Sequence, residues 1–190
     1  MTKLLVLLSG LAYLNCMGAD TPKGTNSPAA KPTVRVRLLN KDGRPTEPMT
    51  MEKVIKTDAE WLKQLTLKQY QIARNKGTEP AFCGAFYDHK KPGIYTCVCC
   101  DLPLFTSDTK FDSGTGWPSF FKPVAQENVT SKIDLSHGMR RVEVLCTRCD
   151  AHLGHVFEDG PPPTNLRYCL NSESLKFNEA APKSDTAKKH

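Results

Sequence analysis

Two Cys-x-x-Cys pairs, Cys97 with Cys100 and Cys146 with Cys149, carry the strongest chemical signal in the chain. Two intervening residues let both sulfurs of a tight turn reach one ion at about 2.3 Å, and two such turns supply the four thiolates of a tetrahedral structural zinc site. The alternatives are two disulfides, a redox-active pair, or a local site that uses the second pair with nearby histidines. The equal spacing of the pairs favours zinc, and Cys99 is then expected to be a free surface thiol.

A different cysteine, Cys169, lies in the stretch LRYCLNS at residues 166–172. If this stretch is a strand, its two-residue period places Arg167, Cys169 and Asn171 on one face. A cation beside a thiol stabilises the thiolate, which is the nucleophilic form. The stretch therefore predicts a reactive cysteine with a lowered pKa, while a half-buried structural cysteine remains the alternative from these residues alone.

Further polar and aromatic residues add to this candidate site. His152 and His155 follow the second cysteine pair directly, and two imidazoles can donate or shuttle protons near neutral pH. Trp117 stands in a glycine-framed stretch, FDSGTGWPSF. A single aromatic residue is usually part of a core, but an indole on such a turn beside a reactive cysteine indicates the wall of a pocket for a small apolar group.

Several long motifs of the chain resemble the B-type methionine sulfoxide reductases, which reduce the R epimer of methionine sulfoxide. The resemblance runs from about Trp61 to Phe177 and rests on KGTEPAFCG, GIYTCVCCDLPLF, FDSGTGWPSF, RVEVLCTRCDAHLGHVFEDGPPPTNLRYCLNS and LKF. It implies two antiparallel sheets with short N-terminal helices and a zinc ion bound by the two cysteine pairs. It also implies that Cys169 is the catalytic nucleophile, with a sulfenic acid as its oxidised product.

The resemblance assigns roles to other positions as well. It implies that His152, His155 and Asn171 bind the polar part of the substrate and that Trp117 packs against the sulfoxide methyl group; we also expect Arg167 and Phe157 to bind substrate. A rival from another class is an exported β domain, joined by zinc, that only binds a partner.

One position departs from the family pattern. Many members carry a second redox cysteine in the glycine-framed turn, where this chain has Thr115. Some members place this cysteine in the N-terminal stretch, and Cys83 lies there. We therefore expect a Cys83–Cys169 disulfide that a thioredoxin-like protein reduces; direct reduction of Cys169 by an external thiol is the alternative.

The elements that position these residues can be read from periodicity and turn signals. Thr57 with Glu60, and Thr66 with Gln69, each match a capping box and predict two short helices. After residue 77, short apolar runs alternate with turn residues, which is typical of an antiparallel β domain. The predicted class is α+β, mostly β, with the reductase domain at residues 54–178.

Composition and the chain ends complete the expectations. The 190 residues are 39% hydrophobic and 24% charged, and the net charge of +6 is spread along the chain, so we expect one soluble domain and no nucleic-acid partner. Residues 1–19 carry a Lys and then an apolar run too short for a stable membrane span, which predicts a cleaved signal peptide and export to a periplasm or the exterior. Lipid anchoring through Cys16 is the alternative. Residues 20–53 are expected to be a linker of low order, with a short hairpin as the alternative, and residues 179–190 a disordered tail.

Overall fold

The computed structural model describes residues 31–180. The expected signal peptide at residues 1–19, the start of the expected linker and residues 181–190 of the expected tail lie outside the described residues. Within the described part of the chain, no helix combines the length and the apolar character that crossing a bilayer requires.

Two short helices begin at the predicted threonines. In α1 (Asp58–Gln64) and α2 (Leu67–Ala73), the N-cap threonine accepts a hydrogen bond from the third helical residue, whose side chain bonds back to the N-cap. Both capping boxes are therefore confirmed, and they stabilise helices too short to persist on propensity alone. Trp61 of α1 is 1% exposed, so this helix is held by packing against the domain.

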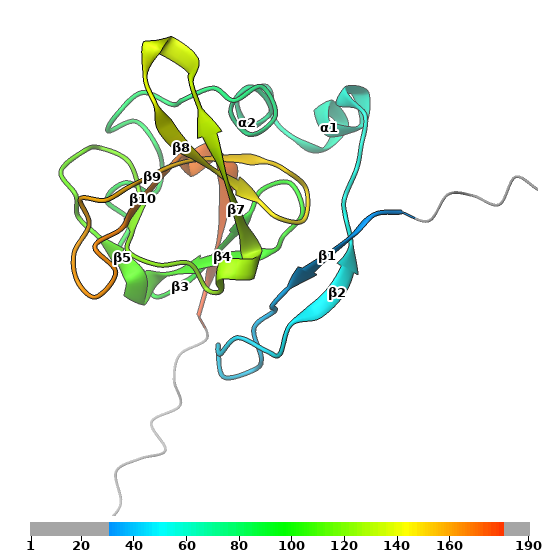
Figure 1. Ribbon diagram of the computed structural model, residues 1–190, viewed down its shortest axis with the longest axis horizontal. Coiled ribbons are helices and arrows are strands. Elements are labelled where there is room, and N and C mark those ends of the chain that lie inside the picture. The colour runs from blue at the N-terminus through cyan, green and yellow to red at the C-terminus, as the bar shows by residue number, and fades with distance from the viewer. Residues whose placement is uncertain (1–30, 181–190) are drawn as a thin grey trace, which may run out of the picture. The chain divides into compact units, whose positions relative to one another are not determined.

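Most of the regular secondary structure of the described chain is antiparallel β-sheet, which confirms the predicted class (Figure 1). The larger sheet has six strands, in the spatial order β5 (Lys110–Phe111), β6 (Ser119–Phe120), β10 (Arg167–Leu170), β9 (His152–Phe157), β8 (Arg141–Cys146) and β7 (Val129–Asp134). The second sheet has three strands, in the order β11 (Leu175–Glu179), β3 (Gly93–Cys97) and β4 (Pro103–Thr106). A separate two-stranded sheet pairs β1 (Thr33–Val36) with β2 (Met49–Glu52).

The β1–β2 hairpin corrects the expectation of a low-order linker for residues 31–53. Val36 is fully buried, and the Asn128 side chain bonds the main chain of Arg37 twice, accepting from its N–H at 2.8 Å and donating to its carbonyl at 2.8 Å. The apolar alternation of β1 and this amide contact together fix the segment against the domain. The structure thus has the alternative, a short hairpin. Composition favoured the linker, because average composition does not register one buried strand residue.

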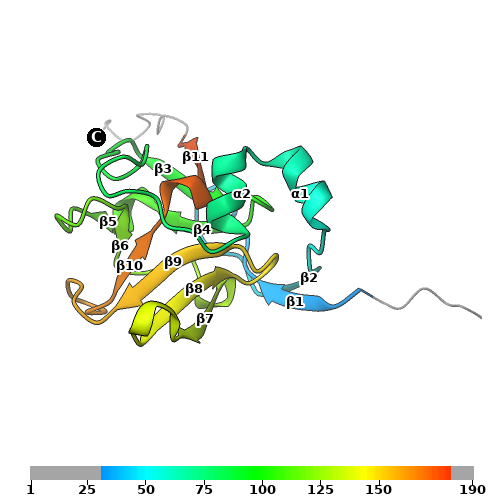
Figure 2. The same ribbon diagram turned by 90° about the horizontal axis from the view of Figure 1, so that it is seen from above.

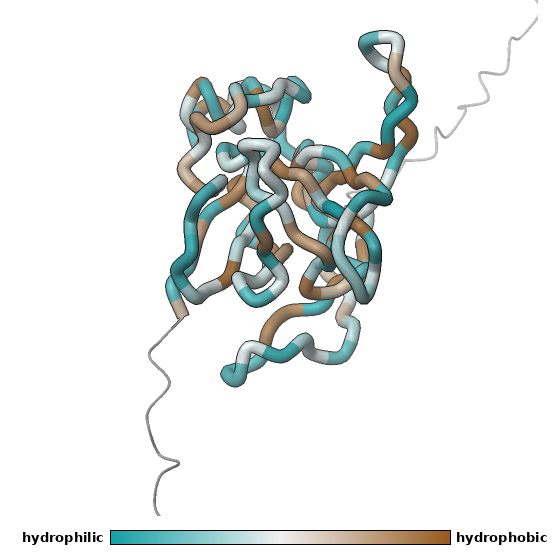
Figure 3. The backbone as a smooth tube through the Cα atoms, turned by 90° about the vertical axis from the view of Figure 1, so that its left-hand side faces the viewer, coloured by the Kyte–Doolittle hydropathy of each residue, from teal (hydrophilic) through white to brown (hydrophobic). Residues whose placement is uncertain are grey.

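The main core lies between the two larger sheets. Tyr95 of β3 and Phe105 of β4 contact Phe120 of β6, with ring centroids 5.0 and 4.7 Å apart, and Tyr168 of β10 packs against Phe105. Figure 3 shows apolar and polar stretches alternating along the chain, as expected for strands with one buried face.

The register of the larger sheet separates a core face from a polar face. Tyr168 pairs with Phe120 and points to the core, whereas the next position, Cys169, pairs with Ser119 on one side and His155 on the other. Residues directly opposite in an antiparallel pair project to the same side, so these three side chains share the face away from the core. α2 lies beside β9 in the view of Figure 2.

Candidate active site and metal site

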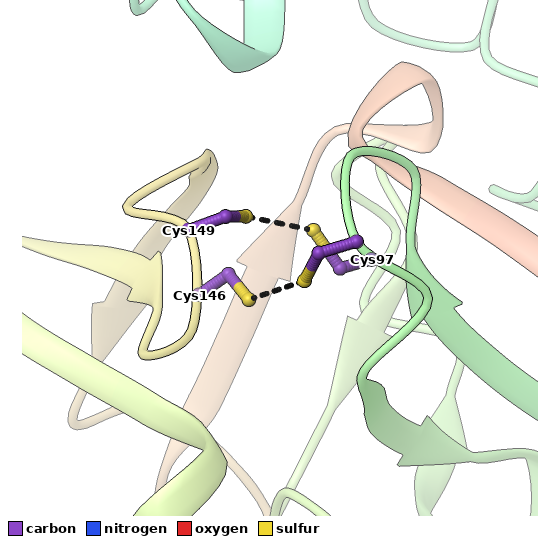
Figure 4. A group of neighbouring side chains, drawn as sticks. Cys97, Cys146 and Cys149 are labelled. Carbon is purple, nitrogen blue, oxygen red and sulfur yellow. Dashed lines mark hydrogen bonds between the residues drawn. The ribbon is translucent and has the colours of Figure 1, made fainter. Parts of the chain in front are cut away.

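The four predicted metal ligands meet at one point, where a turn of each larger sheet faces the other (Figure 4). The ligand atoms of Cys97, Cys100, Cys146 and Cys149 all lie within 4.8 Å of one another. The Sγ atoms are 3.5 Å apart between Cys97 and Cys149 and between Cys100 and Cys146, well beyond a disulfide bond of about 2.05 Å. Four thiolates around zinc at about 2.3 Å would be separated by roughly 3.8 Å, so this donor set fits a tetrahedral zinc ion.

The two metal-binding turns have the same construction. In each, the first cysteine donates its N–H across the turn, from Cys97 to the Leu102 carbonyl and from Cys146 to the Ala151 carbonyl, both at 2.9 Å. The residue after the second cysteine is an aspartate with positive φ, 60° at Asp101 and 56° at Asp150. Asp tolerates this conformation better than most residues, which explains how the chain turns sharply enough to direct both sulfurs to one side.

Cys99 corrects the expectation of a surface thiol, because it is only 2% exposed. The Gln64 side chain of α1 donates to the Cys99 carbonyl at 2.7 Å, and Arg74, at the end of α2, donates to the Cys149 carbonyl at 2.8 Å. The two helices thus cover the metal-binding turns, and Cys99 is enclosed with them. Sequence spacing alone contained no information about this cover.

A β-bulge brings the two histidines to the same face. Residues three apart in a regular strand project to opposite faces, but the β8–β9 register shifts so that Leu145 pairs with His152 and Val144 with Gly154. The imidazole rings consequently lie with centroids 5.5 Å apart. Gly154 has φ +152°, and a Cβ there would lie 2.1 Å from the Cys169 carbonyl oxygen, so only glycine permits this close approach of β9 to β10.

Cys169 lies half-buried at the wall of a small cavity of about 120 Å³. That volume is several times the roughly 30 Å³ share of a single water molecule, so the cavity can hold a small side-chain group. It is lined by Thr78, Trp117, Arg141, Gly154, His155, Phe157, Cys169, Leu170 and Asn171. The structure therefore brings together five of the predicted site residues around one cavity: Cys169, His155, Asn171, Trp117 and Phe157.

Three predicted residues are not among those that line this cavity: His152, Arg167 and Cys83. Cys83 is exposed on the loop before β3. Arg167 is 9% exposed, forms a bidentate ion pair with Asp159 at 2.9 and 2.8 Å, and stacks its guanidinium over Phe157 at 4.5 Å. Its contact with the substrate stays a prediction, and its evident action is electrostatic.

The pKa of the Cys169 thiol departs from expectation. Burial raises this pKa above its ordinary value, while the Arg167 guanidinium and then the hydroxyl of Thr115 lower it without fully compensating. The direction is therefore opposite to the lowered Cys169 pKa that the sequence predicted. That prediction counted the neighbouring cation and omitted desolvation of the thiolate, which sequence does not reveal.

Each histidine is bonded to a carboxylate that also binds a cation. His155 Nε2 lies 2.8 Å from Asp134 Oδ2, to which Arg141 also donates at 2.7 Å. His152 Nδ1 lies 2.8 Å from Glu143 Oε1, whose other oxygen accepts from Lys76 at 2.8 Å, and burial lowers the pKa of His152. These bonds occupy one nitrogen of each ring, and within residues 31–180 Nδ1 of His155 has no hydrogen-bond partner.

Sequence reasoning missed these partners, although one signal for them was present. Arg141 and Glu143 alternate in RVEV, so a two-residue period predicts that both lie on one face of this strand. The register of the sheet makes this the face of Cys169. Asp134 ends β7 and Lys76 lies in the loop after α2, and neither had a local signal. The Asn171 side chain is also engaged, because its Oδ1 accepts the Glu79 N–H at 3.1 Å and its Nδ2 donates to the Leu153 carbonyl at 3.3 Å.

This structure is a mostly β domain in which one cysteine lines a small cavity and four others form a cluster that could hold a metal ion. The model of the SelR domain matches residues 65–179. A peptide methionine sulfoxide reductase MsrB of Hahella chejuensis is 59% identical over 130 residues, which cover 68% of this chain and 94% of that protein. A second MsrB, from Herminiimonas arsenicoxydans, is 61% identical over 126 residues, which cover 66% of this chain and 92% of that protein. The chloroplastic peptide methionine sulfoxide reductase B1 of Oryza sativa subsp. japonica is 63% identical over 122 residues, which cover 64% of this chain and 56% of that protein. The chain belongs to the B-type methionine sulfoxide reductases.

Proposed function

We propose that this protein reduces the R epimer of methionine sulfoxide in oxidised peptides and proteins, with Cys169 as the nucleophile. The observation that carries the proposal is the cavity in which Cys169 lies with the Trp117 indole and the His155 imidazole. An indole offers an apolar face to the sulfoxide methyl group, and the imidazole offers a proton near the oxygen. The binding-module alternative is disfavoured, because the relatives of this chain are reductases by name.

In the proposed reaction the Cys169 thiol passes its proton to His155, and the Cys169 sulfur attacks the sulfoxide sulfur. His155 returns the proton to the sulfoxide oxygen. The sulfur–oxygen bond of the substrate and the new bond between the two sulfurs then break as the hydroxyl passes to Cys169, which becomes a sulfenic acid while methionine leaves. Cys169 is oxidised by two electrons and the substrate sulfur is reduced by two. Asp134 holds the His155 ring. Hydrogen bonds from Ser136 and then from His155, with a smaller effect of the Arg141 charge, hold the Asp134 pKa well below its usual range and keep this carboxylate ionised.

We propose further that Cys83 restores Cys169. Its thiolate would attack the sulfenic acid, release water and form a Cys83–Cys169 disulfide, which a thioredoxin-like dithiol then reduces. Thr115 occupies the turn and cannot form a disulfide, whereas Cys83 is exposed to a partner. The loop of Cys83 abuts that turn, because the Phe82 N–H donates to the Gly116 carbonyl at 2.8 Å. Because Cys83 does not line the Cys169 cavity, the disulfide requires this loop to move.

The metal that this chain would hold is zinc, one ion per chain, bound by the four clustered cysteines. A closed four-thiolate site leaves no position for substrate, so the ion would supply structural stability. Export through residues 1–19 belongs to the proposal as well, and mass spectrometry of the mature N-terminus tests it. A mature chain that still begins at Met1 would refute cleavage.

The central test is single-turnover release of methionine from a methionyl-R-sulfoxide peptide. We expect one methionine per wild-type chain without reductant, none from Cys169→Ser, and wild-type release from the control Cys99→Ser, which also removes one thiol. Cys83→Ser should release one methionine and then stall with a thioredoxin system. Continued reduction by Cys169→Ser would refute the proposed nucleophile, and wild-type cycling of Cys83→Ser would favour direct reduction by an external thiol.

A further inference from the structure

Glu79 is a buried carboxylate that the proposed reaction does not use. It is 2% exposed, and its two oxygens accept hydrogen bonds from the main-chain N–H groups of Ser172 at 2.7 Å and Glu173 at 3.1 Å. Burying a carboxylate is costly unless hydrogen bonds to the charged form compensate. Here the compensation comes from the turn that directly follows the Cys169 strand, so the charge is bound to the catalytic segment itself.

The main chain of Glu79 binds two walls of the Cys169 cavity. Its carbonyl accepts the Trp117 indole N–H at 3.0 Å, and its N–H donates to the Asn171 Oδ1 at 3.1 Å. Trp117 and Asn171 both line the cavity. A single residue outside the cavity therefore fixes the orientation of two side chains inside it.

The packing around this carboxylate leaves no space for it to shift. A Cβ added at Gly84 would lie 2.3 Å from Glu79 Oε1 and 2.3 Å from Ser172 Oγ. Ser172 Oγ in turn accepts the Phe86 N–H at 3.1 Å. The loop that carries Cys83 is thus tied to the turn after Cys169 at both of its ends, by Glu79 and by Phe86.

We propose that Glu79 is a positioning residue for reduction at Cys169. Its carboxylate binds the main chain of the Ser172–Glu173 turn. This anchor fixes the position of the Glu79 main chain, which in turn orients the Trp117 indole and the Asn171 amide. The inference rests on the proposed reaction. A glutamine side chain has only one acceptor oxygen, and its NH2 group would face a main-chain N–H. Glu79→Gln therefore loses one of the two anchoring hydrogen bonds. A displacement of about 1 Å at a positioning group can cost on the order of a hundredfold in rate.

The experiment measures the single-turnover rate constant and the half-saturating concentration for a methionyl-R-sulfoxide peptide. Glu79→Gln should lower the ratio of the two by roughly tenfold or more while still releasing one methionine per chain. The control Glu173→Gln also removes a negative charge, from a carboxylate that forms an ion pair with Lys68. Its ratio of rate constant to half-saturating concentration should stay within about twofold of wild type. Gly84→Ala keeps the charge but displaces it, and should reproduce the loss even if Glu79→Gln does not fold.

A double-mutant cycle separates positioning from general destabilisation. If Glu79 acts through the Trp117 wall, Glu79→Gln should have a clearly smaller effect in a Trp117→Phe background, so that the combined loss is less than the product of the single losses. Independent, multiplicative losses would overturn the proposal, as would wild-type constants in Gly84→Ala or Glu79→Gln. These outcomes leave the nucleophile itself unaffected, since Cys169→Ser tests it through the complete absence of methionine release.

Discussion

Removing one metal ligand should unfold this domain, and Cys97→Ser is the most direct change. Cys97 is fully buried and ends β3, while Cys146 of the other cysteine pair ends β8, so the ion would join the two larger sheets. Structural zinc sites of four ligands contribute about 10–16 kcal/mol of apparent binding free energy near pH 7. A domain of this size has a total free energy of unfolding of about 5–15 kcal/mol. The metal contribution is therefore comparable with the whole stability.

The assay compares Cys97→Ser with Cys99→Ser. Both replace a buried thiol in the same turn, but only Cys97 belongs to the four-sulfur cluster. We expect Cys97→Ser to lose zinc, measured by atomic absorption, and to lose its cooperative thermal transition in near-UV circular dichroism. Cys99→Ser should retain close to one zinc per chain and unfold cooperatively. A strong chelator acting on the wild type should reproduce the behaviour of Cys97→Ser.

Two results would contradict this reasoning. If the chelated wild type keeps its melting temperature and still releases methionine, the four thiols stabilise the fold without a metal. If Cys99→Ser loses zinc as completely as Cys97→Ser, the ligand set is different from the one that the cluster defines.

Three further expectations concern the cavity face. Arg167→Met removes a charge that lowers the Cys169 pKa, so this pKa should rise. The pH profile of methionine release should then move to higher pH, with a lower rate at neutral pH. An unchanged profile would exclude this electrostatic role. His155→Ala should lower the release rate by roughly 10²–10⁴-fold and His152→Ala by less, both with zinc retained, and zinc loss in either would revive a histidine metal site. Gly154→Ala should destabilise the domain by about 3 kcal/mol or more in urea unfolding, because backbone atoms block its Cβ; a stability near wild type would mean that β9 can retreat from β10.

The sequence was most informative where chemistry depends on local spacing. The two capping boxes, the cysteine pairs and the strand period around Cys169 each involve residues within a few positions of one another, and the structure agrees with all of them. Such signals survive because one turn or one strand is enough to express them.

What the sequence concealed depends on contacts between distant segments. The enclosure of Cys99 depends on Gln64 in α1, and the raised pKa of Cys169 depends on burial by the whole sheet. The shared face of His152 and His155 depends on a register shift against β8. A spacing of three residues places side chains on opposite faces of a regular strand, so the local pattern alone does not show that the two histidines share a face.

The unequal exposure of the seven described thiols determines where an oxidant can act. Cys83 is exposed and Cys169 half-buried, whereas the four clustered cysteines and Cys99 are buried. Peroxide arriving from solvent would therefore meet first the two sulfurs whose early oxidation products a thiol can reverse. The sulfurs whose oxidation would dismantle the fold are shielded beneath two helices. The rate of oxidative damage to the buried cysteines would then depend on how often these helices open locally. Ligands or crowding that suppress this opening would slow the loss of folded protein.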